Sequence, residues 1–118
     1  LALLGNVEAT RPFTYIDDAV EATVMLVERA GQRDERVIAN DFNIGPRGGT
    51  RITDVAKMVW DIAGDGRPFK YEIKPTDANT AVRREMIPDK IESAIGWKPK
   101  VELKEGIART VEWIKSIT

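Results

Sequence analysis

The chain changes from a β-prone to a helical pattern within the stretch Arg11-Pro-Phe-Thr-Tyr-Ile-Asp-Asp-Ala-Val-Glu-Ala22. Asp18 followed three residues later by Glu21 is a capping-box arrangement, which predicts that a helix begins at this point. The helix should end near Gly31, where a polar stretch begins. Its apolar face consists of Val20, Val24 and Val27. A strand that leads directly into an amphipathic helix indicates an α/β chain.

The segment after this helix predicts a strand, a turn and a second helix. Asp41-Phe-Asn-Ile-Gly45 is a short β-prone run that enters a turn rich in glycine and proline, which extends to Gly49. Thr53 is the expected N-cap of the second helix, and Gly64 is its expected left-handed stop. The apolar stripe of this helix consists of Val55, Met58, Val59 and Ile62.

The second half of the chain again alternates strand and helix. Phe69-Lys-Tyr-Glu-Ile-Lys74 alternates apolar and polar residues, which predicts a strand with one buried face. The stretch 76–84 has no periodicity and is long for a connection, so we expect a binding loop there. Pro88 suits the first turn of a short helix that Gly96 would stop. A last amphipathic helix has its apolar stripe at Leu103, Ile107, Val111 and Ile114.

The composition is that of one globular domain, with 118 residues of which 42% are hydrophobic and 31% charged. Together with the elements above, it predicts a single α/β unit over residues 1–118, with about four helices and short strands. The longest apolar runs fall far short of the roughly 20 residues that cross a bilayer, so we expect no membrane span. Leu1–Leu4 is apolar without a basic flank, and we interpret it as a strand from inside a longer protein rather than a signal peptide.

Charge and residue usage argue against several classes of function. The formal net charge is −1, with 18 basic and 19 acidic residues intermixed, so no basic stripe is available for nucleic acid. The absence of cysteine excludes disulfides and a thiolate nucleophile and fits a cytoplasmic location. We expect no metal site. Because histidine is also absent, proton transfer would fall to tyrosine, lysine or carboxylates.

Some features could carry chemistry but also have a structural explanation. Gly45-Pro-Arg-Gly-Gly-Thr50 lies between a strand and a helix, where a phosphate loop would lie, yet it matches neither glycine fingerprint. Positive φ in a tight turn explains these glycines better. Asp17 and Asp18 could form an acid/base pair, but their position before a helix favours capping.

Four arginines occur at the ends of elements or in loops, where a guanidinium could bind a diphosphate bidentately. They are Arg11, Arg47, Arg83 and Arg84. Surface charge is the default role of arginine, so the two explanations stand side by side. The tryptophans Trp60, Trp97 and Trp113 lie beside apolar helical stripes, so we expect them in the core rather than as stacking platforms.

Three ordered blocks extend this interpretation: the stretch from Arg11 to Ala22, Phe42-Asn-Ile-Gly45, and the stretch from Ile95 to Trp113. They resemble R-D-F-T-Y-V-D-D-V-V-E-A, Y-N-I-G and L-G-W-K-P-K-V-S-L-E-E-G-L-R-R-T-V-E-W, which are patterns of the extended short-chain dehydrogenase/reductase family that acts on nucleoside-diphosphate sugars. The resemblance runs almost end to end. It implies an α/β C-terminal fragment of a Rossmann-type enzyme.

The resemblance also implies substrate-binding residues. The family arginine that contacts the substrate diphosphate corresponds to Arg11, which makes it the first site residue that we predict. Lys74 and Asp77 resemble the ends of a family R-x-G-D motif in basic charge and in the aspartate. Arg83 and Arg84 are further predicted substrate contacts, although the chain is a few residues longer than the family pattern in this region.

The catalytic parts of the family are not found in this sequence. A Tyr-x-x-x-Lys pair is absent, because Tyr15 is followed at the fourth position by Ala19 and Tyr71 by Pro75. The resemblance therefore implies that NAD and the catalytic pair belong to an N-terminal half, and we expect no catalytic or cofactor-binding residue in this fragment. The implied parent is an NAD-dependent sugar epimerase or dehydratase, with 4-epimerase favoured, and usually a homodimer. The fragment alone could be a monomer.

Three alternatives stay open at this stage. The parent could be a 4,6-dehydratase or a nucleotide-sugar decarboxylase of the same family, since those activities differ mostly in residues outside this sequence. From another class, the chain could be a free-standing noncatalytic nucleotide-binding module.

Overall fold

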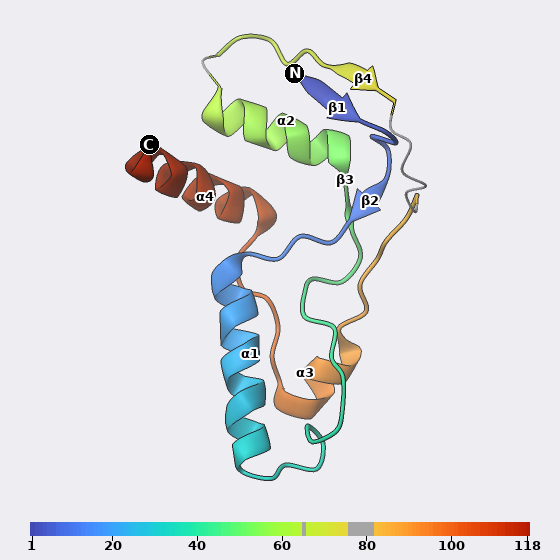
Figure 1. Ribbon diagram of the computed structural model, residues 1–118, viewed down its shortest axis with the longest axis vertical. Helices are drawn as coiled ribbons and strands as arrows, with labels where there is room; N and C mark the ends of the chain where they lie inside the picture. Colours follow the sequence, from blue (N-terminus) through green and yellow to red (C-terminus); the bar gives the residue numbers. More distant parts are fainter. Residues whose placement is uncertain (65, 76–81) are drawn as a thin grey trace.

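The computed structural model describes residues 1–64, 66–75 and 82–118 (Figure 1). Its helices are α1 (Ile16–Gly31), α2 (Ile52–Ala63), α3 (Asp89–Ile95) and α4 (Leu103–Ile117). Its strands are β1 (Ala2–Leu4), β2 (Thr10–Arg11), β3 (Thr50–Arg51) and β4 (Glu72–Lys74). The predicted α/β chain with about four helices and short strands is confirmed. Within this described part, no helix has the length and apolarity of a membrane span.

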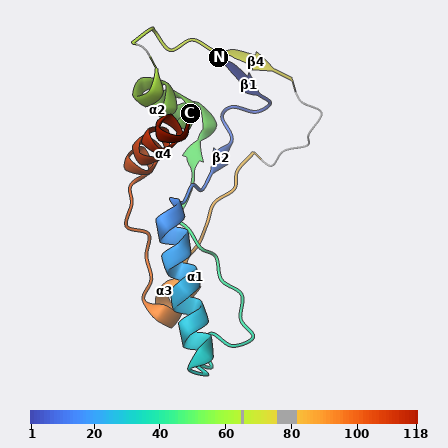
Figure 2. The same ribbon diagram turned by 60° about the vertical axis from the view of Figure 1, so that its left-hand side comes forward.

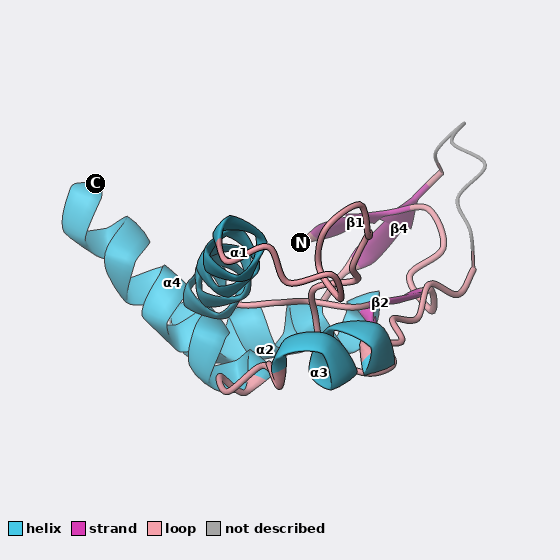
Figure 3. Cartoon of the chain, turned by 90° about the horizontal axis from the view of Figure 1, so that it is seen from below, coloured by secondary structure: helices cyan, strands magenta, loops and turns pink. Residues whose placement is uncertain are grey.

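The molecule is elongated, with extents of 53 × 36 × 20 Å. Helices α2 and α4 and the strand pair β1–β4 lie at one end, and α1 and α3 lie at the other (Figures 1 and 2). Extended segments connect the two ends. Seen from below in Figure 3, α1 is nearly end-on, with α4 on one side of it and the β1–β4 pair on the other. We call the end with α2 and α4 the upper lobe and the end with α1 and α3 the lower lobe.

The strands form two small ladders. β1 and β4 pair in parallel, with Leu3 opposite Ile73, whereas β2 and β3 are antiparallel. The predicted strand over residues 69–74 is confirmed only for β4, and its expected buried face is wrong, because Tyr71 and Ile73 are 43% and 57% exposed. No described element covers this side of the ladder.

The best-packed core lies in the lower lobe, between α1, α3 and the segments that follow them. Its buried side chains are Ala22, Val37, Ile91, Ala94, Ile95 and Trp97. Phe42 and Ile44 pack against this cluster. The strand predicted over Asp41–Gly45 is wrong, since this segment has no ladder partner among the described residues.

The tryptophans differ in burial. Trp97 is 2% exposed, as expected for a core residue. Trp60 is half-buried, and its Nε1 donates to the Arg67 carbonyl at 2.8 Å. The expectation is wrong for Trp113, which is 62% exposed near the end of α4, where no described element lies over it.

The helix ends correct some local predictions. Helix α1 begins at Ile16, and the Asp18 carboxylate makes no cap. It is 3% exposed and accepts hydrogen bonds from the Lys100 N–H and from the Val101 N–H, the latter at 2.9 Å. The predicted capping box is therefore wrong, because this carboxylate binds the α3–α4 connection instead.

Three further helix ends were predicted with mixed success. α2 begins at Ile52, after Arg51, so Thr53 lies inside the helix rather than at its N-cap. α2 does stop at Gly64, its C-cap, as predicted, but Gly64 has φ −73° and ψ 175°, which is extended rather than left-handed. Gly96 does adopt the left-handed conformation, with φ 71°, and it ends α3 as expected.

Candidate substrate-binding site

Strand β2 is the centre of the candidate site, because other chain segments hydrogen-bond to both of its edges. On one edge it pairs with β3. On the other, the Thr10 N–H donates to the Val82 carbonyl and the Arg84 N–H donates to the Thr10 carbonyl, each at 3.1 Å. The tertiary structure therefore brings the backbone of Arg11 beside that of Arg83 and Arg84.

These segments approach each other most closely at Gly49. A Cβ atom at this position would lie 2.9 Å from the Arg84 carbonyl oxygen and 3.2 Å from the Arg11 carbonyl carbon. Both neighbours are backbone atoms and cannot rotate away. The preceding Gly48 has φ 81°, which favours glycine. Glycine at these two positions therefore allows the turn to bring Arg11 and Arg84 together.

The same turn is not arranged as a phosphate loop. A Cβ atom at Gly45 would lie 2.6 Å from the Met86 sulfur and 2.8 Å from the Thr14 hydroxyl oxygen. Protein atoms thus occupy the space that a phosphate would need at Gly45, as they do at Gly49. This packing supports the explanation of the glycines as turn residues.

The N-terminus of α2 is also occupied by protein acceptors. The Ile52 N–H donates to the Ala9 carbonyl and the Thr53 N–H donates to the Val7 carbonyl, both at 3.1 Å. Free N–H groups at a helix N-terminus are what bind a dinucleotide phosphate. The start of α2 therefore does not fit an NAD-binding loop.

The Arg11 side chain is held against its own strand. It is half-buried, and its Nη1 donates to the Thr10 carbonyl at 2.6 Å. Pro12 follows directly, and a short segment then leads into α1. A guanidinium carries a planar set of donors that suits the oxygens of a diphosphate.

The other predicted arginines are exposed, and two of them, Arg47 and Arg83, make ion pairs. The Arg83 Nε donates to Glu85 at 2.6 Å. Arg47 pairs with Asp89. Arg84 is exposed, and its backbone rather than its side chain holds the site together.

Lys74 is not part of the β2 cluster. It ends β4 opposite Leu4, its carbonyl accepts a hydrogen bond from the Gly5 N–H at 2.9 Å, and its Nζ lies 3.4 Å from Glu72. The predicted site residue Asp77 lies outside the described residues. The structure thus brings three of the five predicted positions together in the β2 cluster: Arg11, Arg83 and Arg84.

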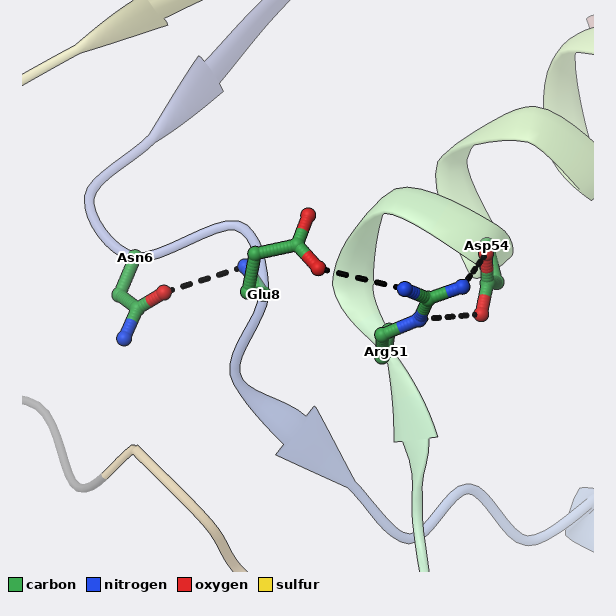
Figure 4. Close-up of polar contacts among 4 residues, drawn as sticks. All are labelled: Asn6, Glu8, Arg51 and Asp54. Carbon is green, nitrogen blue, oxygen red and sulfur yellow. Dashed lines mark hydrogen bonds and ion pairs between the residues drawn. The ribbon is translucent and has the colours of Figure 1, made fainter.

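A polar network that the sequence analysis missed lies at the end of the β2–β3 ladder, where β3 runs into α2 (Figure 4). Arg51 donates from Nε and Nη2 to the two carboxylate oxygens of Asp54, at 2.9 and 3.2 Å, and from Nη1 to Glu8 at 3.3 Å. The Glu8 N–H in turn donates to the Asn6 side-chain oxygen at 3.1 Å. The network ties β3 and the start of α2 to the segment between β1 and β2.

The charges in this network stabilise each other. The hydrogen bonds that Arg51 donates to the Asp54 carboxylate raise the pKa of Arg51 above its usual value. The sequence did contain one signal for the contact, since Arg51 and Asp54 are three residues apart at a helix start. The contribution of Glu8 could not be found in this way because it depends on the fold.

A cleft of about 220 Å³ is lined in part by the residues that directly follow Arg11 in the sequence. Its walls come from the segment 12–15, the turn at 46–50 and the connection at 99–103. Arg47 and Lys100 supply basic charge to its lining, and Asp18 and Glu102 supply acidic charge. Phe13 and Leu103 supply apolar surface. A mixed lining of this kind suits a polar ligand with a ring, such as a sugar or nucleoside.

This chain belongs to the family of NAD-dependent nucleotide-sugar epimerases and dehydratases, the extended short-chain dehydrogenases/reductases. The family model described as GDP-mannose 4,6 dehydratase matches residues 1–110. The chain is 32% identical to a probable UDP-glucuronate 4-epimerase from Rhizobium meliloti, over 94% of the chain and 36% of the relative. It is 29% identical to UDP-glucuronic acid decarboxylase 1 from Arabidopsis thaliana, over 94% of the chain and 23% of the relative.

Solved structures share the fold. UDP-glucuronic acid 4-epimerase from Bacillus cereus, in complex with UDP-glucuronic acid and NAD, has a TM-score of 0.83 and 24% identity, over 100% of this chain and 36% of that one. UDP-glucose 4-epimerase from Thermotoga maritima, with UDP-glucose, has a TM-score of 0.79 and 26% identity, over 99% and 35%. The chain thus spans about a third of the length of most of the relatives that it matches.

Proposed function

We propose that this chain is the C-terminal, substrate-binding part of an NAD-dependent nucleotide-sugar epimerase or dehydratase, with Arg11 as its main diphosphate contact. The observation that carries the proposal is the convergence of Arg11, Arg83 and Arg84 at β2, over Gly49. In this proposal the chain holds the nucleoside-diphosphate sugar and the remaining part of a longer protein holds NAD. NAD would supply reversible hydride transfer at a sugar carbon.

Among the activities of the family, we favour a 4-epimerase that acts on a UDP-sugar. Relatives of at least 30% identity support this choice, among them the probable UDP-glucuronate 4-epimerase and a putative UDP-glucose 4-epimerase from Methanocaldococcus jannaschii. We further propose that the longer protein is a cytoplasmic homodimer. The chain by itself should neither bind NAD appreciably nor turn over a nucleotide sugar, because the dinucleotide loop and the Tyr/Lys pair lie outside its sequence.

The proposal is tested by nucleotide-sugar binding to the longer protein carrying Arg11→Ala or Arg11→Lys. A hydrogen bond to a charged group contributes about 1.5–3 kcal/mol, so the alanine variant should lose affinity roughly tenfold or more. Lysine should restore only part of it, because a point charge cannot make a bidentate pair. Calorimetry with UDP-glucose and UDP-glucuronate gives the affinities, and NAD affinity should stay unchanged.

Arg36→Ala is the matched control. Arg36 is an exposed arginine that pairs with Asp34, and it lies in the connection after α1, away from β2. Its loss should leave nucleotide-sugar affinity at the wild-type value. If Arg11→Ala behaves like this control, Arg11 is a surface charge and the proposed role is wrong.

A further inference from the structure

Arg51 is an unusual residue for the place where it lies, the N-cap of α2. Serine, threonine, asparagine and aspartate are preferred at an N-cap, because a side-chain oxygen can accept a hydrogen bond from a helix N–H. An arginine side chain has no acceptor, and its positive charge lies at the positive end of the helix dipole. Local helix formation therefore does not explain this residue, and its tertiary contacts must do so.

Those contacts join α2 to the segment that precedes β2. The Arg51 guanidinium donates two hydrogen bonds to Asp54 in the first turn of α2, and a third, of 3.3 Å, to Glu8 (Figure 4). Glu8 lies two residues before Thr10, which is the first residue of β2. Because Asp54 is bound through two donors, the planar fork is held in one orientation towards Glu8.

Backbone bonds hold the same segment on either side of Glu8. The first two N–H groups of α2 donate to the carbonyls of Ala9 and Val7, respectively, both at 3.1 Å. Val7 and Ala9 are 5% and 2% exposed, whereas the Glu8 side chain between them is 60% exposed. The two buried residues anchor the segment, and Arg51 binds the carboxylate that remains on its outer side. The start of α2 therefore fixes three consecutive residues immediately before β2.

The strand register separates Arg51 from the Arg11 side chain. In the β2–β3 ladder, Arg51 is opposite Thr10, and Thr50 is opposite Arg11. Successive side chains of a strand point to opposite faces, and directly paired residues share a face. Arg51 thus lies on the face away from Arg11, so its influence on Arg11 passes through the backbone of β2.

We propose that Arg51 is a positioning residue, which fixes β2 through Glu8 and so holds the Arg11 guanidinium in place before a nucleotide sugar binds. The link is Thr10, which is paired with Arg51 and whose carbonyl accepts the Arg11 Nη1 hydrogen bond at 2.6 Å. A side chain that is ordered beforehand loses less conformational entropy on binding, which improves affinity. The proposal rests on the function proposed above and assigns a role to a residue that does not touch the substrate.

A double-mutant cycle on the longer protein tests the proposal, with UDP-glucose affinity measured by calorimetry. Arg51→Ala should lower the affinity about threefold or more, on the scale of an exposed ion pair, and leave NAD affinity unchanged. In the Arg11→Ala background, the same substitution should cause no further loss, because it acts through Arg11. Unchanged affinity in Arg51→Ala, or an equal loss in both backgrounds, would overturn the proposal.

The single variants keep this test separate from that of the proposed function. Arg11→Ala alone tests whether Arg11 binds the diphosphate. Affinity that is lost in Arg11→Ala but kept in Arg51→Ala would leave the proposed function intact and remove only the positioning role.

Glu8→Gln distinguishes positioning from direct contact with the diphosphate. It keeps the size of the side chain and removes the charge that Arg51 binds. If Arg51 acts by positioning, this variant should also lower the affinity. If Arg51 itself bound the diphosphate, loss of the competing carboxylate would raise the affinity, and a rise would therefore overturn the proposal.

Lys57→Ala is the matched control. Lys57 is a cation on α2 that is 59% exposed and pairs with Asp61 at 2.6 Å, and this ion pair stays within the helix. Its loss should leave UDP-glucose affinity at the wild-type value. A loss equal to that of Arg51→Ala would reflect only the removal of positive charge from this region and would contradict the positioning role.

Discussion

The hydrogen bonds of Asp18 give the sharpest prediction for stability. Its carboxylate is buried on α1 and accepts the Lys100 N–H at 3.1 Å on both oxygens and the Val101 N–H at 2.9 Å. These bonds hold the first turn of α1 to the connection that leads into α4, and so help to join the two lobes. Removing the carboxylate leaves two backbone donors without their acceptor.

The expected loss of stability follows from these two unsatisfied backbone donors. An unsatisfied buried donor costs about 1–3 kcal/mol, and water can reach these part-buried groups, so we expect about 2–3 kcal/mol of lost stability for Asp18→Ala. Asp18→Asn keeps one carbonyl acceptor and should cost about half of that. Such losses are large against a typical total stability of about 5–15 kcal/mol.

Urea unfolding of the purified variants, followed by circular dichroism, measures these differences. Asp17→Asn is the control, because Asp17 is adjacent on α1, of the same chemistry and exposed, and it should change stability by no more than about 0.5 kcal/mol. If Asp18→Asn and Asp17→Asn give the same unfolding midpoint, the carboxylate does not join the lobes and the reasoning is refuted.

Three further predictions concern single positions. Gly49→Ala should destabilise the protein by about 1–3 kcal/mol, because its Cβ would overlap the Arg84 carbonyl. Gly31→Ala should be neutral or stabilising, because a Cβ atom at this position would have no neighbour within 4 Å. Thermal unfolding of the two variants measures this difference. Acrylamide should quench Trp113 strongly and Trp97 weakly in single-tryptophan variants, and equal quenching would contradict their different burial. The hydrogen bond from the Arg36 guanidinium lowers the pKa of Asp34 from 3.8 to about 2, so this pair adds stability that is present above pH 3.8 and is lost as the pH falls towards 2. Arg36→Ala should return the pKa of Asp34 towards 3.8 in an NMR titration, and an unchanged value would contradict the assigned cause.

The helices were largely predictable because their signals are local. Apolar spacing located α1, α2 and α4 from the sequence, and the left-handed Gly96 marked the end of α3. Local side-chain capping was less predictable, as Asp18 illustrates. Its spacing to Glu21 fits a capping box, but a carboxylate binds whichever N–H groups the fold presents, and here those belong to residues 100 and 101.

Strand prediction failed where pairing decides the outcome. Asp41–Gly45 has β-prone residues, yet a strand needs a neighbour, and among the described residues that segment has none. The β-prone stretch predicted from Arg11 onwards is a strand only in β2 (Thr10–Arg11), which is fixed by backbone hydrogen bonds to β3 and to Val82 and Arg84.

The sequence by itself determined the family and the helices, because motif blocks and helical periodicity involve residues close together in the chain. It also predicted Arg11 as the first site residue. Only the tertiary structure decided which other residues join it. The backbone of Arg84 lies beside that of Arg11 because Gly49 allows their close approach. Lys74 lies instead opposite β1. Arg51 donates a hydrogen bond to Glu8, which comes from a different segment of the chain. The physical reason is that these contacts depend on close approach of segments far apart in the chain, which no local spacing encodes.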